Sequence, residues 1–165
     1  MVRIAVLVSG GGTNLQALID AQSRGELKNG RIAAVLSSRP DAYALERAAR
    51  AGIPGYVVAR KDFASNREMT IALVDKLREL NIGLVVLAGF LHILTGEMVA
   101  AFPNAILNVH PALIPSFCGA GYYGLHVHEA ALAYGVKLTG ATVHFVNEEP
   151  DGGPIVLQKA VEILE

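Results

Sequence analysis

The sequence predicts an α/β fold built on an open, mostly parallel, twisted sheet. Two observations carry this prediction: short runs rich in Val, Ile and Leu recur along the chain, and amphipathic helical patterns separate them. The runs are too short and too uniformly apolar for exposed strands, so we expect strands that are buried on both faces. The regular alternation of strand and helix is typical of βαβ crossovers, which set neighbouring strands parallel.

The expected elements follow in a regular order up to Val109. Strands are expected at residues 3–8, 31–36, 55–58, 83–88 and 105–109. Helices are expected at residues 14–24, 42–51 and 65–80, where apolar residues recur three and four positions apart. Gly25, Gly52 and Gly96 punctuate these segments and are interpreted as breakers or helix caps.

The pattern changes after Val109. Residues 111–124 are rich in proline and glycine, so we expect a loop there, followed by a short helix at residues 126–134. Two β-like runs, at residues 139–147 and 154–163, flank a turn-rich segment at residues 148–153. We expect these runs to form an antiparallel pair added to the parallel sheet. Since no repeat or linker divides the chain, we expect one domain over residues 1–165.

Composition narrows the classes of function. Hydrophobic residues make up 52% of the 165 residues and charged residues 18%, which is enough apolar surface for a sizeable core. The net charge of -1, without a Lys/Arg cluster, argues against nucleic acid and favours small-molecule partners. The single cysteine, Cys118, cannot form an internal disulfide, and the first apolar run breaks at glycines too early for a secretory or membrane segment. We expect a cytoplasmic monomer or homodimer that does not associate with membranes.

The first candidate site joins the first expected strand to the first expected helix. Three consecutive glycines follow Ser9, and glycines there can take positive φ and bring backbone N–H groups close to an anion. Thr13 or Asn14 is expected to cap a helix whose positive dipole end points the same way. The segment suits a phosphate better than a dinucleotide, because Leu15 replaces the third glycine of that fingerprint. A tight turn without a ligand is the alternative.

The second candidate site is Asn108 and His110, at the carboxyl end of an expected parallel strand. Open α/β sheets bind their ligands at that edge. The two residues are two positions apart, so their side chains project from the same face of the strand. An amide N–H and an imidazole together suit a developing oxyanion and a moving proton. A buried histidine with a purely structural role is the alternative.

The third candidate is Asp151, in the turn between the last two expected strands. A carboxylate near His110 would favour the protonated imidazole and fix the orientation of the ring. An acidic residue before two glycines is also a common turn former, which is the alternative.

The other histidines carry no recognisable metal-ligand spacing. His126 and His128 are two positions apart at the start of an expected helix, so they diverge. His92 lies in an expected loop and His144 in an alternating strand, and both are interpreted as structural. We expect no metal site.

The motifs occur together and in order, with Ala88-Gly89-Phe90 and Leu113-Ile114-Pro115 between them. In this combination the whole chain resembles the phosphoribosylglycinamide formyltransferases of the folate-dependent formyltransferase superfamily. The motifs N-x-H-P, L-x-P, T-x-H-F and D-x-G-P are similar to those of the superfamily, and S-G-x-G-[ST]-N-L points to the glycinamide ribonucleotide branch. The resemblance implies a Rossmann-like formyltransferase fold. It also implies transfer of a formyl group from 10-formyltetrahydrofolate to the amine of glycinamide ribonucleotide in de novo purine biosynthesis.

The resemblance also implies roles for particular residues. It matches Asn108, His110 and Asp151 to the catalytic residues of the family. It matches Gly12, Thr13 and Asn14 to the loop that binds the nucleotide phosphate. For the folate it implies contacts from Arg67, Leu91, His92, Ile93, Leu94, Asn108, Asn147, Glu148, Glu149, Pro150 and Asp151. His92 departs from the Arg or Lys usual in the family at that position.

The implied mechanism is direct transfer through a tetrahedral oxyanion, which Asn108 and protonated His110 would stabilise. The alternatives are a formyltetrahydrofolate deformylase-like hydrolase, a methionyl-tRNA formyltransferase, and a non-catalytic nucleotide-binding module of the same fold. Family members continue past the last strand into a helix. We expect the domain at residues 1–165 to lack this helix and to expose an apolar face along residues 154–163.

Overall fold

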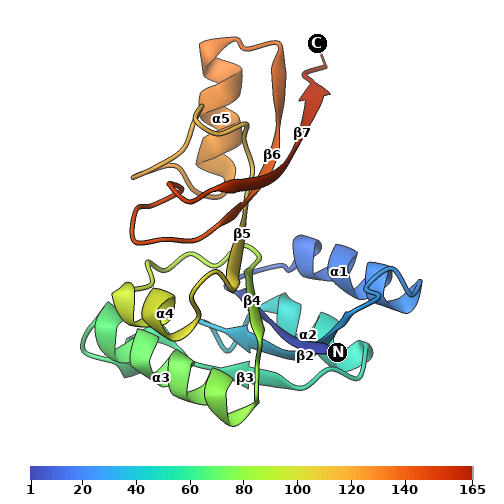
Figure 1. The fold of residues 1–165 in the computed structure, drawn as a ribbon. Helices are drawn as coiled ribbons and strands as arrows, with labels where there is room; N and C mark the ends of the chain where they lie inside the picture. The colour runs from blue at the N-terminus through green and yellow to red at the C-terminus, as the bar shows by residue number, and fades with distance from the viewer. Residues whose placement is uncertain (165) are drawn as a thin grey trace. The chain divides into compact units, whose positions relative to one another are not determined.

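The computed structural model describes residues 1–164. It divides the chain into two compact units, one over Met1–Ile106 and one that begins at Leu107. Figure 1 traces both units from the amino terminus in blue to the carboxyl terminus in red. The single domain expected from the sequence stays a prediction.

The first unit holds a parallel sheet. Its strands are β1 (Val2–Val8), β2 (Gly30–Ser37), β3 (Gly55–Val57) and β4 (Leu84–Leu87), in the order β3-β2-β1-β4. Each neighbouring pair is parallel, as the sequence predicts. β1, β2 and β4 are largely buried, which confirms that prediction for them. It is wrong for β3, because this three-residue edge strand is exposed at both ends.

Helices cover both faces of this sheet (Figure 1). They are α1 (Thr13–Ser23), α2 (Tyr43–Arg50), α3 (Asn66–Glu79) and α4 (Gly96–Ala101), with a short 3₁₀ turn η1 (Arg60–Asp62). Alternate residues of β1 pack with the buried residues of α1 and α2 in one core cluster. α3 buries Met69, Leu73 and Leu77 on the other face and packs against α4.

Glycines end two of these helices, as predicted. Gly25 and Gly52 follow the caps of α1 and α2 with φ of 73° and 69°, a left-handed conformation that costs glycine little. The prediction for Gly96 is wrong, because this residue begins α4 and Thr95 precedes it as the cap. A six-residue helix is too short to give a clear amphipathic repeat, so the sequence pattern missed α4.

The second unit is antiparallel. β5 (Ile106–His110) pairs with β6 (Leu138–Phe145), which pairs with β7 (Ile155–Glu162). α5 (Leu125–Tyr134) lies beside these strands and buries Val127 and Ala131. The antiparallel pair β6-β7 and the loop before α5 are both confirmed. The fold class is therefore α/β, with parallel strands first and antiparallel strands last.

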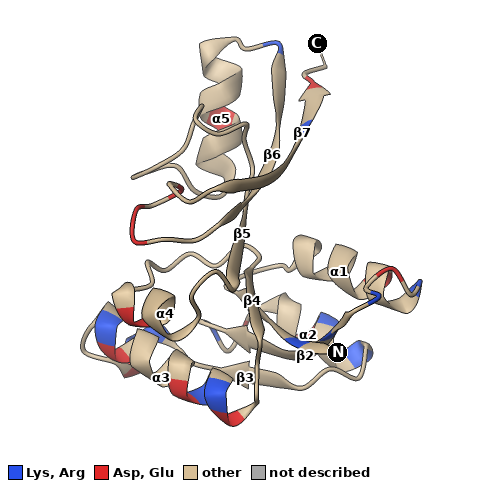
Figure 2. Ribbon diagram, in the orientation of Figure 1, with Lys and Arg blue, Asp and Glu red and all other residues tan. Residues whose placement is uncertain are grey.

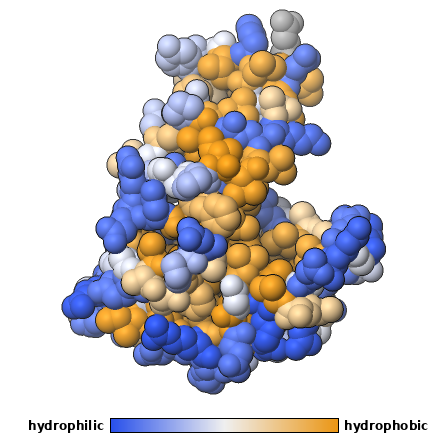
Figure 3. All heavy atoms as spheres, in the orientation of Figure 1, coloured by the Kyte–Doolittle hydropathy of each residue, from blue (hydrophilic) through white to orange (hydrophobic). Residues whose placement is uncertain are grey.

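Exposed apolar residues and charged residues gather on particular elements. Every residue of β7 is exposed, including the apolar Ile155, Val156, Leu157 and Val161, so the apolar exposure expected along residues 154–163 is present. On the face drawn in Figure 3, apolar side chains are exposed over both units. Charged residues gather on α3, and the turn between β6 and β7 is acidic (Figure 2). Among residues 1–164, no helix is long and apolar enough to cross a membrane.

Candidate active site

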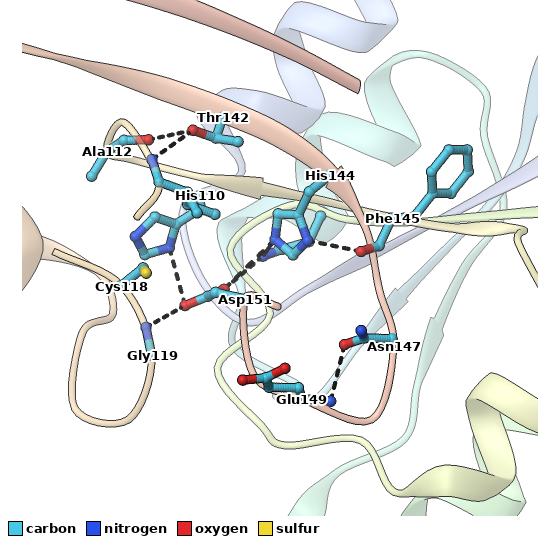
Figure 4. A network of polar contacts seen from close by, with 12 residues as sticks. His110, Ala112, Cys118, Gly119, Thr142, His144, Phe145, Asn147, Glu149 and Asp151 are labelled. Atoms are coloured by element: carbon cyan, nitrogen blue, oxygen red, sulfur yellow. Dashed lines mark hydrogen bonds and ion pairs between the residues drawn. The ribbon is translucent and has the colours of Figure 1, made fainter. Parts of the chain in front are cut away.

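The carboxylate of Asp151 lies between the rings of His110 and His144 in the second unit (Figure 4). One carboxylate oxygen is 3.6 Å from His110 Nδ1, and the other is 3.6 Å from His144 Nε2. Asn108 Nδ2 lies 3.1 Å from His144 Nε2 and 3.5 Å from an Asp151 oxygen. Both histidine side chains are almost fully buried, and that of Asp151 is 14% exposed. Three residues that the sequence singled out, Asn108, His110 and Asp151, therefore meet at one carboxylate. Together with His144 they form what we call the Asp151 cluster, namely Asn108, His110, His144 and Asp151.

Strand pairing explains this arrangement. In the antiparallel register of β5 and β6, Asn108 lies opposite His144, and His110 lies opposite Thr142. Side chains alternate along a strand, so these four side chains share one face of the sheet. Thr142 donates its hydroxyl to the Ala112 carbonyl at 2.7 Å, which holds the start of the loop after β5.

The turn after β6 carries Asp151 back to this face. Asp151 has a φ of 54°, a left-handed conformation that aspartate tolerates better than most residues. The Phe145 amide donates to the Pro154 carbonyl at 2.9 Å and closes the turn on β6. A Cβ at Gly153 would lie 1.7 Å from the Phe145 carbonyl oxygen, so only glycine fits at that position. The Asp-Gly-Gly-Pro sequence is therefore both a turn former and the means of placing the carboxylate.

The loop after β5 holds the cluster from the other side. Gly119 donates its backbone N–H to an Asp151 oxygen at 2.9 Å. His110 Nε2 lies 2.8 Å from the Phe117 carbonyl, so this nitrogen carries the hydrogen and donates it. Cys118 lies between these two residues, and burial, reinforced by the charge of Asp151, raises the pKa of its thiol. The thiolate is disfavoured, so Cys118 has no sign of nucleophilic activation.

Asp151 and His144 shift each other's pKa in opposite directions. Burial by itself would raise the pKa of Asp151, but the contacts from His144 and the Gly119 N–H and the charges of both histidines hold that pKa below its usual value. Burial would likewise lower the pKa of His144, but Asp151 and the Phe145 carbonyl raise it above its usual value. The pair therefore favours the carboxylate beside an imidazolium.

Sequence reasoning missed His144. The sequence indicates a structural residue of an alternating strand, and the structure shows in addition that its ring contacts both Asn108 and Asp151. The local pattern contains no signal for this contact, because it depends on which residue of β6 lies opposite Asn108. The T-x-H-F motif includes His144, but it does not indicate which residue His144 contacts.

The protonation of His144 determines which way the Asn108 amide turns. His144 Nδ1 lies 2.9 Å from the Phe145 carbonyl and so carries a hydrogen. In the neutral ring, Nε2 accepts an N–H from Asn108. In the imidazolium, Nε2 becomes a donor and Asn108 must present its carbonyl oxygen, which leaves both hydrogens of Nδ2 for another acceptor.

The glycine loop of the first unit joins β1 to α1. Gly12, with a φ of 73°, is the cap of α1, and its carbonyl accepts the Gln16 N–H at 2.9 Å. The prediction that Thr13 or Asn14 caps the helix is wrong, because α1 begins at Thr13 and no side chain within residues 1–164 caps it. A cap without a side chain leaves the first backbone N–H groups of the helix without a side-chain acceptor. Such groups suit an external anion.

Buried serines fix the ends of three parallel strands close to this loop. Ser9 Oγ lies 2.7 Å from Ser38 Oγ and accepts the Leu91 N–H at 3.0 Å. The Ser9 N–H in turn donates to the Gly89 carbonyl at 3.1 Å. The loop after β4 is therefore tied to the end of β1, which sets the position of the segment from Leu91 to Leu94.

The candidate folate residues lie in both units and are mostly exposed. Leu91 and Ile93 are exposed, and burial together with the charge of Arg60 lowers the pKa of the intervening His92. Leu94 is half-buried. Residues 147–150 form the turn that carries Asp151, where Asn147 accepts the Glu149 N–H at 2.9 Å.

Arg67 is exposed and forms an ion pair within the first unit. Its guanidinium forms an ion pair with Glu97, at the start of α4. The Arg67 and Thr95 contacts hold the pKa of Glu97 at about 2, so Glu97 is charged near neutral pH. Any anion that binds Arg67 has to compete with Glu97.

Comparison with known proteins gives consistent results. A family model described as formyl transferase matches residues 2–165. A phosphoribosylglycinamide formyltransferase of Haemophilus influenzae is 48% identical over 163 residues, which cover 99% of this chain and 74% of that protein. The human trifunctional purine biosynthetic protein adenosine-3 is 44% identical over 161 residues, which cover 98% of this chain and 15% of that protein. The crystal structure of glycinamide ribonucleotide transformylase 1 from Symbiobacterium toebii has a TM-score of 0.93 at 47% identity, over 100% of this chain and 75% of that chain.

Proposed function

The chain belongs to the formyl transferase family, and from that premise we propose that it transfers the formyl group of 10-formyltetrahydrofolate to the amine of glycinamide ribonucleotide. This reaction is a step of de novo purine biosynthesis. Among its relatives are enzymes named for the reaction and trifunctional proteins of purine biosynthesis. The chain is accordingly a formyl-transferring enzyme.

The observation that carries the proposal is the environment of Asp151. A carboxylate with a lowered pKa lies beside two histidines and an asparagine amide, in a nearly buried cluster. Formyl transfer needs a donor for a developing oxyanion and a group that moves a proton, and the Asp151 cluster supplies both kinds of group.

In the proposed reaction the substrate amine attacks the formyl carbon. The new C–N bond forms as the carbonyl electron pair moves to oxygen, and the resulting oxyanion accepts N–H hydrogens from Asn108 and His110. When the carbonyl re-forms, the bond to N10 of the folate breaks. The proton lost by the attacking amine goes to N10, with Asp151 assisting through water. No covalent enzyme intermediate is involved.

The two ring contacts of His110 support this role. Nε2 is 2.8 Å from the Phe117 carbonyl, within hydrogen-bond range. Nδ1 is 3.6 Å from Asp151, too long for a hydrogen bond but close enough to feel the carboxylate charge. In the protonated ring Nδ1 also carries a hydrogen, which it can donate to a substrate oxygen while Nε2 holds the ring on the Phe117 carbonyl.

For the substrates we propose the residues expected from the sequence. The backbone N–H groups of Gly12, Thr13 and Asn14 bind the ribonucleotide phosphate, as suits a helix that begins without a side-chain cap. The folate contacts the segment from Leu91 to Leu94 and the turn at residues 147–151, with Arg67 facing its acidic end. The formyl donor is 10-formyltetrahydrofolate and no metal takes part.

Hydrolysis of the formyl folate is the principal alternative, since water could replace the amine without any change in the Asp151 cluster. A non-catalytic nucleotide-binding module is the other. Both are tested by following formation of the deformylated folate with and without glycinamide ribonucleotide. We expect folate product only when the ribonucleotide is present. Equal rates with and without it indicate a hydrolase, and ribonucleotide binding without any product indicates a non-catalytic module.

A further inference from the structure

We infer that Arg47 is a positioning residue for the glycine loop. It holds the Gly11 carbonyl so that the N–H of Gly12 faces away from α2 and toward a bound phosphate. The inference rests on the proposed function, which makes this phosphate that of the ribonucleotide.

One face of α2 contacts the glycine loop at three places. Arg47 Nε donates to the Gly11 carbonyl at 2.7 Å, and the Ala44 N–H donates to the Gly10 carbonyl at 3.1 Å. A Cβ placed on Gly12 would lie 2.7 Å from Ala44 Cβ, so the loop backbone packs directly on α2. The carbonyls of two successive peptides therefore both point at α2.

The directions of these two carbonyls determine the directions of the following N–H groups. In a trans peptide the C=O and the N–H of one planar unit point in opposite directions. The unit that contains the Gly10 carbonyl also contains the Gly11 N–H, and the unit with the Gly11 carbonyl contains the Gly12 N–H. Both N–H groups consequently point away from α2. Successive N–H groups with this orientation form an anion-binding concavity.

The Arg47 side chain is itself held in place. Its Nη1 donates to Gln16 Oε1 at 3.1 Å, and its guanidinium carbon lies 4.9 Å from the centre of the Tyr43 ring. Arg47 thus links α2, α1 and the loop between β1 and α1. Its neighbour Arg50 is exposed, bonds to Tyr43 and Glu46, and forms no hydrogen bond with the loop among the described residues. Arg50 is therefore a matched control, because it carries the same charge one turn further along α2.

Two substitutions separate positioning from simple charge attraction. Glutamine has an amide nitrogen at the same bond distance from the backbone as Arg Nε, so Arg47→Gln keeps the donor to Gly11 and removes the charge. In Arg47→Met the new side chain is similar in length to glutamine, and both the hydrogen-bond donor and the charge are removed. If Arg47 only attracts anions, the two variants have the same effect.

The test measures binding of glycinamide ribonucleotide and of inorganic phosphate by calorimetry, together with KM for both substrates, after circular dichroism has established that each variant is folded. We expect Arg47→Met to raise the ribonucleotide KM about tenfold or more, the size expected when a charge-assisted hydrogen bond is lost, with kcat and the folate KM little changed. Arg47→Gln should recover most of the loss, and Arg50→Met should resemble the wild type. Equal effects of Met and Gln, or wild-type behaviour of Arg47→Met, overturn the inference.

A second measurement does not depend on a variant. The wild-type protein, labelled with ¹⁵N-glycine, is titrated with inorganic phosphate, and the Gly11 and Gly12 amide signals should move most. Unmoved signals in a protein that binds the ribonucleotide overturn the inference but leave the proposed function intact. A wild-type protein that binds no ribonucleotide and transfers no formyl group overturns the proposed function itself.

Discussion

The glycine loop and the Asp151 cluster use opposite means to prepare a site. The loop offers uncharged backbone N–H groups, and their direction is set by φ at Gly12 and by packing on α2. The cluster offers side chains around one carboxylate, and its properties are set by charge and burial. A substitution therefore damages the loop by changing its shape, whereas an isosteric substitution can disable the cluster while the fold persists. The difference shows that the two sites should be probed with different kinds of variant.

The largest effect should come from removing charge without changing shape. Asp151→Asn keeps the size of the side chain, but the carboxylate that polarises His110 and His144 is gone. We expect kcat to fall by about 10²-fold or more, with an unchanged circular dichroism spectrum, and we expect similar losses for Asn108→Ala and His110→Ala. Steady-state kinetics provide the measurement. A kcat within about threefold of wild type would leave Asp151 as a turn residue.

The loop should respond to a change of shape. Gly12→Val adds a Cβ that would lie 2.7 Å from Ala44 Cβ, at a φ of 73° that valine strongly disfavours. We expect the ribonucleotide KM to rise about tenfold or more while the folate KM changes little, together with a lower Tm. Gly10→Ala is the matched control, because a Cβ there meets nothing within 4 Å, and its effect should be smaller. Equal increases in both KM values would show that the loop is only structural.

A pH titration sharpens the contrast, since only the cluster carries charge. His144 should titrate above 6.5 in the wild type, and in Asp151→Asn it should titrate below 6.5, because burial then acts without the opposing carboxylate. Histidine signals followed by NMR measure both values. If the pKa of His144 is the same in the wild type and in Asp151→Asn, the Asp151 carboxylate does not influence the titration of His144.

The same shifts fix the sign of the stability difference between wild type and Asp151→Asn. Asp151, with a lowered pKa, contributes stability that is present above its unfolded value of 3.8 and is lost as pH falls through the folded value. His144, with a raised pKa, contributes stability that is present below its unfolded value of 6.5 and is lost as pH rises through the folded value. The difference in unfolding free energy between the wild type and the variant should therefore be largest between these two pH limits. Denaturant unfolding of both proteins across that pH range measures how this difference depends on pH.

The smallest effect should come from the surface pair of Arg67 and Glu97, which belongs to neither the loop nor the cluster. Glu97→Gln frees the exposed guanidinium, so the folate KM should fall, by less than about threefold because solvent and salt screen such charges. Arg67→Ala should raise the folate KM by a similarly small factor. Adding salt should reduce both effects. A folate KM that moves in neither variant would remove Arg67 from the folate residues.

The two sites also differ in how much the sequence could reveal. Periodic apolar runs predicted the order of strands and helices, because burial in an α/β fold repeats along the chain. The spacing of two residues between Asn108 and His110 correctly predicted that they share one face of the strand. His144 was missed, because its contact with Asn108 depends on pairing between distant strands. The cap at Gly12 was misassigned, because the helix starts one residue earlier than the side-chain pattern indicates.

The most direct test of the central claim is the fate of a ¹³C-labelled formyl group on 10-formyltetrahydrofolate, followed by NMR in the presence of the protein. With glycinamide ribonucleotide present, the label should appear as its N-formyl derivative, and the Asp151→Asn protein should form this product about 10²-fold more slowly. Without the ribonucleotide, the label should stay on the folate. Label that appears as formate at the same rate with and without the ribonucleotide would contradict the account, because water and not the amine would then be the acceptor.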